Sequence, residues 1–118
     1  MPSEGRRWKF RVRHILDAVA GANAYTRGMT RETFETSMMP ADAVVTKLMT
    51  IGEATRHIPQ EVKDRHPEVP WRKMQALRNV VVHEYERLDL GIIWNVVLDD
   101  LPPLVPILER ILDVEPGE

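Results

Sequence analysis

Arg78, Asn79, His83 and Tyr85 are the side chains best suited to chemistry in this sequence, and they surround three consecutive valines in LRNVVVHEYERLDLG. Histidine can accept and return a proton near neutral pH, an effect typically worth about 10²–10⁴ in rate. Arginine stays charged and offers a fork of donors to phosphate oxygens. This combination suits RNA cleavage without a metal, in which the ribose 2′-hydroxyl is the nucleophile and the products carry a cyclic phosphate and a 5′-hydroxyl.

On a helix these four side chains occupy two neighbouring strips. Asn79 and His83 lie one turn apart, so Asn79 can reach and orient the His83 ring. Arg78 and Tyr85 share the next strip, and the core face is supplied by Met74, Leu77, Val81 and Leu88. Arg78 and His83 are about 140° apart around an ideal helix. One copy therefore does not direct both at a single point, whereas two copies facing each other across a two-fold axis would close that gap.

Judged from residue chemistry alone, a structural role for these residues is more common than a catalytic one. An arginine and a histidine five positions apart often occur by chance, the first in a surface pair and the second hydrogen-bonded at a helix edge. The three valines favour a β-strand by propensity. No partner strand is visible in the sequence, so we predict a helix in which the valines are packed.

Helical periodicity extends over most of the chain. A first helix is predicted over about 7–27, ended by Gly28, followed by short turns that begin at Thr30 and Thr33. A second helix follows Pro40 and ends at Pro59. Gly52 lies inside it, and because an interior glycine costs about 1 kcal/mol against alanine, we expect close helix packing there.

The second half of the chain predicts a short helix over 59–67, a third long helix over about 70–87 and a fourth capped by Asp89. Three prolines, Pro102, Pro103 and Pro106, must break or kink this fourth helix. Trp71 and Trp94 are expected in the core. Long helices joined by short connections are typical of an all-α antiparallel bundle of four to five helices.

Composition indicates one globular domain over residues 1–118, with 43% hydrophobic residues and a net charge of −2. The chain has no cysteine, which excludes disulfides, thiolate zinc sites and a cysteine nucleophile. The histidines are too scattered for a metal site, and no cofactor is expected. The N-terminus resembles no signal peptide, and the apolar runs are too short to span a bilayer. We expect a cytoplasmic protein with no membrane partner.

The N-terminal run RRWKFRVRH concentrates five cations. A local basic patch can contact RNA phosphates even on an acidic protein. The candidate RNA contacts are Arg6, Arg7, Lys9, Arg11 and Arg13. A solvated or partly frayed helix start explains the run equally well, and both interpretations stay open. Glu84 and Glu86, which flank the motif, are expected on a solvated helix face.

RNVVVHEY matches the R-x4-H-x-Y pattern and resembles HepT-like toxins of the HEPN superfamily. Further segments are similar to that family in the same order: HILDAV, IGEATRHIP, HPEVPWRKMQALRN and LDDLPPL. The resemblance covers about residues 10–113. The predicted first helix of this chain is basic, whereas the first helix of that family often carries acids.

The resemblance implies a homodimeric helical bundle with a composite ribonuclease site at the dimer interface. His83 would be the general acid/base, Arg78 would stabilise the phosphorane and Asn79 would be an orienting polar group. The implied partner is a minimal nucleotidyltransferase antitoxin, as in type II- or type VII-like toxin–antitoxin pairs, which would add AMP to Tyr85. The implied substrate is transfer RNA or messenger RNA. The alternative is a non-catalytic helical module that binds the nucleotidyltransferase or a nucleotide, with His83 in a structural role.

Overall fold

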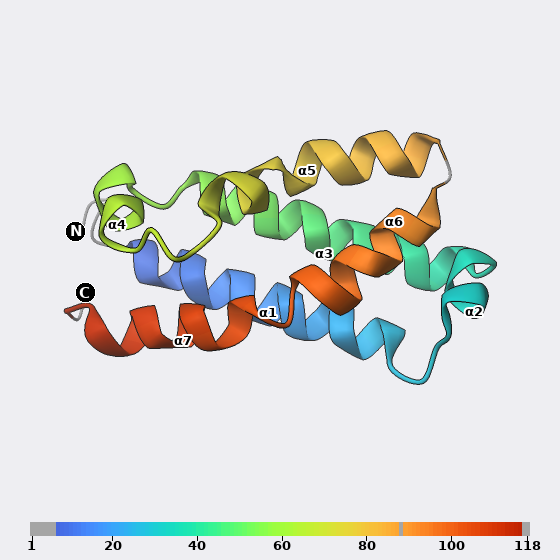
Figure 1. The fold of residues 1–118 in the computed structure, drawn as a ribbon, viewed down its shortest axis with the longest axis horizontal. Coiled ribbons are helices and arrows are strands. Elements are labelled where there is room, and N and C mark those ends of the chain that lie inside the picture. The colour runs from blue at the N-terminus through green and yellow to red at the C-terminus, as the bar shows by residue number, and fades with distance from the viewer. Residues whose placement is uncertain (1–6, 88, 117–118) are drawn as a thin grey trace.

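The computed structural model describes residues 7–87 and 89–116, so Arg6 and Leu88 lie outside the described residues. Every regular element within these ranges is helical, and the long helices alternate in direction (Figure 1). The prediction of an all-α antiparallel bundle is therefore confirmed.

In chain order, the helices are α1 (Trp8–Thr26), α2 (Arg31–Glu35), α3 (Met38–Arg56), α4 (Gln60–Arg65), α5 (Trp71–Glu86), α6 (Leu90–Asn95), the π-helical turn η1 (Val96–Asp100) and α7 (Leu104–Val114). α3 is the central long helix and packs along both α1 and α5. α6 starts at the end where α5 finishes, and α7 runs back along α1, so that the start of α1 and the end of α7 lie at one end of the bundle (Figure 1).

The helix boundaries follow local signals in the sequence. Gly28 ends α1 with a φ of 77°, a conformation that glycine adopts without steric cost. A capping box between Thr30 and Thr33 begins α2. α3 begins at Met38, earlier than predicted, and Pro40 lies in its first turn, where a backbone N–H has no helical acceptor to lose. Asp89 caps α6 as predicted, accepting from the backbone nitrogen of Ile92 at 3.4 Å.

The predicted break in the fourth helix is confirmed. The segment Leu90–Asp100 is followed by Leu104–Val114 at a bend of 49°. Pro106 falls in the first turn of α7, so its missing N–H breaks no helical bond. In the part of the chain that the structure describes, no single helix has the length and apolar composition to cross a membrane, and only this bent pair taken together reaches them.

The core forms around α3. Val44, Leu48 and Ile51 are fully buried between α1 and α5. Trp71 and Trp94 are buried as predicted, and the Trp94 ring lies 5.3 Å, centroid to centroid, from that of Phe34. This aromatic contact fastens α6 to α2.

A polar cluster ties the C-terminus to the start of α1 and the end of α4. Arg65 Nη2 donates to Glu115 Oε1 at 2.7 Å, and His66 Nε2 lies 2.6 Å from Glu115 Oε2. Lys9 is buried and its Nζ donates to the backbone oxygens of Leu112 and Glu115, at 3.2 and 2.7 Å. The hydrogen bond from Arg65 is the main reason that the pKa of Glu115 is lowered to about 2, with a further hydrogen bond from His66.

We expect Glu115→Gln to lower the free energy of unfolding by about 1–2 kcal/mol, because it weakens charge-assisted hydrogen bonds to Arg65 and His66. Urea unfolding at neutral pH measures the change. Glu109→Gln is the matched control, since Glu109 is an exposed acid on α7 outside this cluster. Equal effects of the two variants would contradict the assigned role of Glu115.

The same cluster predicts a loss of stability in acid. The folded-state pKa of Glu115, about 2, lies below its ordinary value of 4.5. Folding therefore favours the ionised carboxylate, and this contribution is complete above the ordinary value and lost as the pH falls toward the folded-state value. The stability difference between wild type and Glu115→Gln should shrink between about pH 5 and pH 2. A constant difference over that range would contradict the prediction.

Candidate functional site

α5 carries all four residues of the candidate site, and contacts at both ends hold it. At its start, Trp71 Nε1 donates to the backbone oxygen of His66 at 2.9 Å. At its end, the backbone nitrogen of Asp89 donates to the backbone oxygen of Glu84 at 2.8 Å. Between these contacts the helix continues through the valine run without interruption. The motif is therefore presented on a regular helix, as predicted.

The expectation that all three valines are packed is wrong for two of them. Val81 is fully buried, whereas Val80 is 40% exposed and Val82 is 38% exposed. The reason is geometric: consecutive residues on a helix point about 100° apart, so only one of three can face the core. Val80 and Val82 consequently leave apolar surface on either side of α5.

Arg78 lies where α5 is in close contact with α3, opposite Gly52. A Cβ added to Gly52 would lie 3.0 Å from the Arg78 backbone nitrogen and 3.2 Å from the Gln75 carbonyl oxygen. Both neighbours are rigid helix backbone. The predicted close packing at Gly52 is thus confirmed, and its partner is the first residue of the motif. The glycine fixes how far Arg78 stands from α3.

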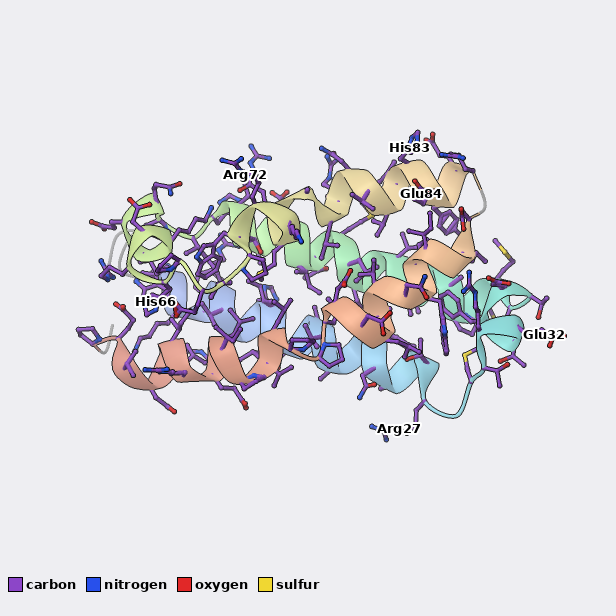
Figure 2. The ribbon with its side chains drawn as sticks, viewed as in Figure 1. Arg27, Glu32, His66, Arg72, His83 and Glu84 are labelled. Atoms are coloured by element: carbon purple, nitrogen blue, oxygen red, sulfur yellow. The ribbon has the colours of Figure 1, made fainter. Side chains whose placement is uncertain are left out.

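His83 and Asn79 point away from the bundle. Both are exposed, and the His83 side chain projects from the outer side of α5 (Figure 2). Among the described residues, no hydrogen bond or ion pair engages the side chains of Arg78, Asn79 or His83. The hydrogen bond through which Asn79 would orient His83 is therefore not formed within this chain. The regular helix also keeps Arg78 and His83 about 140° apart, as expected from their spacing.

Tyr85 is half-buried and packs against the core. It lines a cavity of about 350 Å³ between α3 and α5, together with Val82, Thr46 and two acids, Asp42 and Glu86. The phenol is thus placed at the edge of a hollow, on the side of α5 that faces α3. It does not share the outward strip of His83.

Glu84 departs from the solvated face expected for it. Its side chain is only 14% exposed, and within the described residues its buried Oε2 has no hydrogen-bond partner. Its Oε1 lies 4.0 Å from Arg87 Nη1. Because it follows Val81 by three positions, it shares the edge of the core face. Glu86, in contrast, is exposed as expected.

The basic N-terminal run does not adjoin His83. It lies at the start of α1, at the opposite end of the bundle from the His83 end of α5 (Figure 2). The predicted RNA contact of Lys9 is replaced by a structural role, because its Nζ donates to backbone oxygens at the C-terminal end of α7. The guanidinium groups of Arg7 and Arg11 lie 5.7 and 4.5 Å from the centroid of the Phe10 ring. Arg13 is exposed.

No metal centre is formed in the described ranges, because no three His, Asp or Glu side chains gather there in a way that could hold an ion. The chemistry available is that of an exposed imidazole and a nearby guanidinium. The imidazole can exchange a proton, and the guanidinium can stabilise negative charge on a phosphate.

Comparison with protein families decides the assignment. The family model described as "Ribonuclease HepT-like" matches residues 15–111, which include the whole of the R-x4-H-x-Y motif. This chain belongs to the HepT-like ribonuclease family. The resemblance read from the motif and its flanking segments is thereby confirmed.

Individual relatives agree with this membership. The HepT-like chain is 34% identical over 97 residues to the "Probable ribonuclease HepT" of Thermococcus cleftensis, covering 82% of this chain and 88% of that protein. It is 31% identical over 104 residues to a "Putative RNase" of Caldanaerobacter subterraneus subsp. tengcongensis, covering 88% of this chain and 93% of that protein. No solved structure matches it significantly.

A third relative is longer than this chain. The HepT-like chain is 31% identical over 105 residues to a Methanocaldococcus jannaschii protein named "Gamma-glutamylcyclotransferase and putative RNase". The match covers 89% of this chain but only 47% of that protein. The chain therefore spans about half the length of this relative.

We predict that Gly52→Ala destabilises the HepT-like fold. Its methyl group would meet helix backbone at 3.0 Å, and overpacking typically costs about 1–3 kcal/mol, which exceeds the gain of up to about 1 kcal/mol in helix propensity. Thermal or urea unfolding measures the change. In the control Gly21→Ala, the new methyl group meets only the flexible end of Lys47, so that variant should be neutral or stabilised. The prediction is wrong if Gly52→Ala is as stable as Gly21→Ala.

Proposed function

We propose that this HepT-like protein is a metal-independent endoribonuclease. The observation that carries the proposal is the exposed His83 side chain, which no described residue engages, on the same helix as Arg78 in a chain of this family. In the reaction the 2′-hydroxyl attacks the neighbouring phosphorus and loses its proton. The bond from phosphorus to the 5′-oxygen breaks, and that oxygen gains a proton. The products end in a cyclic phosphate and a 5′-hydroxyl.

His83 supplies the proton transfer in this proposal, and Arg78 stabilises the negative charge of the phosphorane. An imidazole is suited to both accepting and donating near neutral pH. A guanidinium stays charged and donates two parallel hydrogen bonds to phosphate oxygens. Asn79 shares the outward strip with His83, one turn away, and would orient the imidazole or the substrate once the site is complete.

The complete site is proposed to form between two copies of the chain. Arg78 and His83 point in directions about 140° apart on one helix, so the arginine of one protomer would act with the histidine of its partner. Exposed Val80 and Val82 flank this strip, and apolar surface beside the outer face of α5 favours association. A two-fold axis near α5 would bury these valines and bring the two motifs together.

Neutralisation is proposed to occur at Tyr85, by a nucleotidyltransferase antitoxin that adds AMP to the phenol. The position of Tyr85 at the edge of the cavity shared with Asp42 and Glu86 supports this role. An added nucleotide would place a phosphate charge and a bulky group beside α5, where it would repel RNA and obstruct the second protomer. The proposed substrate is cellular RNA, either transfer RNA or messenger RNA.

We expect the variants Arg78→Ala and His83→Ala each to lose at least about 10²-fold in RNA cleavage, the loss of one charge-stabilising donor for Arg78 and of one general acid/base group for His83. Purified protein freed of its partner is incubated with total RNA in excess EDTA, and the ends of the fragments are characterised. Wild type should leave cyclic phosphate and 5′-hydroxyl ends. If folded, unmodified wild type does not cut, or if His83→Ala cuts equally well, the protein is instead a non-catalytic helical module.

Mixing the two inactive variants tests the composite site. In a heterodimer of Arg78→Ala and His83→Ala, one interface site contains an intact arginine and an intact histidine, and the other contains neither. Random exchange makes half of the dimers heterodimeric, so activity should recover to about a quarter of the wild-type level. Without recovery after verified subunit exchange, the arginine and histidine act within one protomer.

Tyr85→Phe tests neutralisation. The variant keeps the ring that packs against the core and removes only the hydroxyl acceptor. We expect it to retain ribonuclease activity but to resist inactivation when it is incubated with the nucleotidyltransferase and ATP. Intact-mass measurement should detect added AMP on wild type and not on the variant. Tyr25→Phe, at an exposed tyrosine on α1, is the matched control, and addition of AMP to Tyr85→Phe would move the acceptor to another residue.

A further inference from the structure

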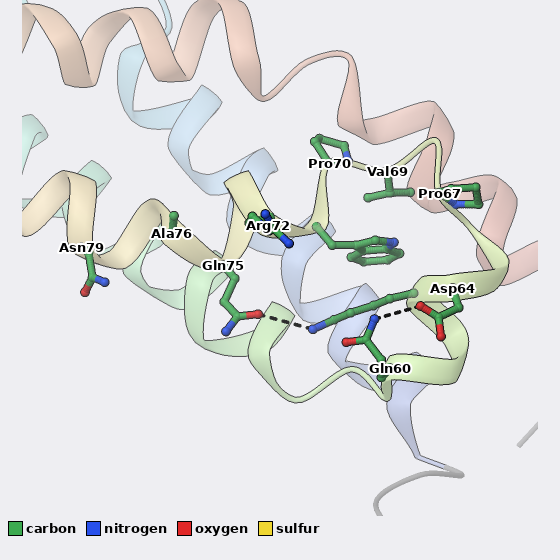
Figure 3. Close-up of a pocket in the computed structure, with 11 residues that line it drawn as sticks. Gln60, Asp64, Pro67, Val69, Pro70, Arg72, Gln75, Ala76 and Asn79 are labelled. Atoms are coloured by element: carbon green, nitrogen blue, oxygen red, sulfur yellow. Dashed lines mark hydrogen bonds between the residues drawn. The ribbon is translucent and has the colours of Figure 1, made fainter.

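A cleft of about 790 Å³ lies between α4 and the outer face of α5 (Figure 3). One wall carries Lys63 and Asp64, and the other is the first part of α5, from Trp71 to Asn79. None of its side chains belongs to the motif except Asn79, which stands at one end of the cleft (Figure 3). The cleft therefore begins where the candidate catalytic strip begins.

The cleft offers only a small apolar floor, because its aromatic residue is 8% exposed. Trp71 lines it, and its indole Nε1 is held by the backbone oxygen of His66 at 2.9 Å. Val69 beside it is also buried. The rim is formed largely by amide side chains, including those of Gln75 and Asn79. Amides beside a small apolar surface fit the edge of a nucleobase, whose polar atoms can hydrogen-bond to them.

Lys63 provides a cation without a carboxylate partner among the described residues. Its only hydrogen bond there is a weak one, from Nζ to the amide oxygen of Gln75 at 3.4 Å, marked by a dashed line in Figure 3. Partial burial lowers the pKa of Lys63 because it removes water from the ammonium. An anion would replace that water, so this group is ready to bind a phosphate.

Arg72 is a second cation in the cleft, on the wall opposite Lys63. It is exposed, lines the cleft and projects outward from α5 (Figure 2). The one carboxylate in the cleft, Asp64, accepts a hydrogen bond from Gln60 Nε2 at 2.9 Å. Figure 3 places Asp64 at the end of the cleft opposite Asn79. Among the described lining residues, the half of the cleft nearer to His83 therefore carries no carboxylate.

The cleft and His83 share one strip of α5. Arg72, Asn79 and His83 follow each other at intervals of seven and four residues, which keeps them on the same outward face. At 1.5 Å per residue the distance along the axis from Arg72 to His83 is about 16 Å. A stacked nucleic-acid strand advances about 3.4 Å per nucleotide, so this distance corresponds to about five nucleotides.

We propose that the α4–α5 cleft binds the RNA strand on one side of the cleaved bond. Lys63 and Arg72 would contact backbone phosphates, and the amides of Gln75 and Asn79 would hydrogen-bond to the edge of a base. This proposal rests on the proposed ribonuclease function and names the substrate as single-stranded RNA that extends several nucleotides beyond the cleaved bond.

The test compares wild type with the double variant Lys63→Gln/Arg72→Gln on three RNAs: a short core around the cleaved bond, and the same core lengthened at its 5′ or its 3′ end. For wild type, kcat/KM should rise when one of the two ends is lengthened. The double variant should lose this gain, by about ten- to a hundredfold for two charged contacts, while its cleavage of the short core stays unchanged. Equal losses on short and long substrates would overturn the proposal.

Arg27→Gln is the matched control, because Arg27 is an exposed arginine on the far side of the bundle from α5 (Figure 2). Arg27→Gln should keep the rise in kcat/KM that lengthening the RNA produces. If Arg27→Gln loses the gain as well, general charge attraction explains the effect and the cleft does not. Unchanged far-ultraviolet circular dichroism and unfolding midpoints show that each variant is folded.

Binding measured without cleavage separates this proposal from the ribonuclease function. In a His83→Ala background, fluorescence anisotropy with the lengthened RNA should show weaker binding for the double variant. The slope of log affinity against log salt should fall by about 1.4, or 0.7 for each lost phosphate contact.

If wild type never cuts RNA but this difference is found, only the proposed function fails. If RNA affinity is unchanged and nucleotidyltransferase binding is lost instead, the cleft is a protein-docking site and the proposal is wrong.

Discussion

At Gly52 the backbones of α3 and α5 come so close that a methyl group would lie 3.0 Å from the Arg78 backbone nitrogen. The burial of Leu77 and Val81 sets how α5 is rotated about its own axis, and the glycine lets this side of α5 approach α3 closely. Once that rotation is set, Arg78 stands beside α3 while Asn79 and His83 face outward. The placement of the candidate site thus follows from this burial and from one missing side chain on a neighbouring helix.

A second set of contacts fixes the start of α5. Glu115 holds Arg65 and His66, and the backbone oxygen of His66 accepts from the Trp71 indole. A continuous path of hydrogen bonds therefore runs from the end of α7, through the end of α4, to the first residue of α5. This path holds α4 beside the start of α5 and so shapes the cleft. In the proposed function, a cluster far from His83 would in this way affect how RNA approaches it.

Much of the fold was predictable because the signals are local. Apolar spacing, Gly28, the Asp89 cap and the proline run indicate where helices begin, end and break, and the structure agrees with them closely. The fate of Lys9, which is buried against the end of α7, depends on a contact between the two ends of the chain. No local pattern reveals such a contact, and a cationic run is normally read as solvated.

The candidate site was predictable in part for the same reason. The 140° between Arg78 and His83 follows from helix geometry alone. The exposure of Val80 and Val82 also follows from it, and the strand propensity of the valine run obscured that consequence. Gly52 signalled close packing but not its partner. The α4–α5 cleft was not predicted, because Lys63 and Arg72 belong to different helices and only the path of the connecting segment brings them together.

The distribution of charge decides where RNA affinity must come from. The chain has a net charge of −2, the basic N-terminal run lies at the far end of the bundle, and the exposed acid Glu86 stands close to His83 in the sequence. The exposed cations nearest to His83 in the sequence are Arg78 and Arg87, and Arg87 Nη1 lies 4.0 Å from the Glu84 carboxylate. Lys63 of α4 and Arg72 of α5 add two further cations in the α4–α5 cleft. If His83 is the catalytic group as proposed, a cationic cleft between α4 and the same helix would favour cleavage of strands long enough to occupy both.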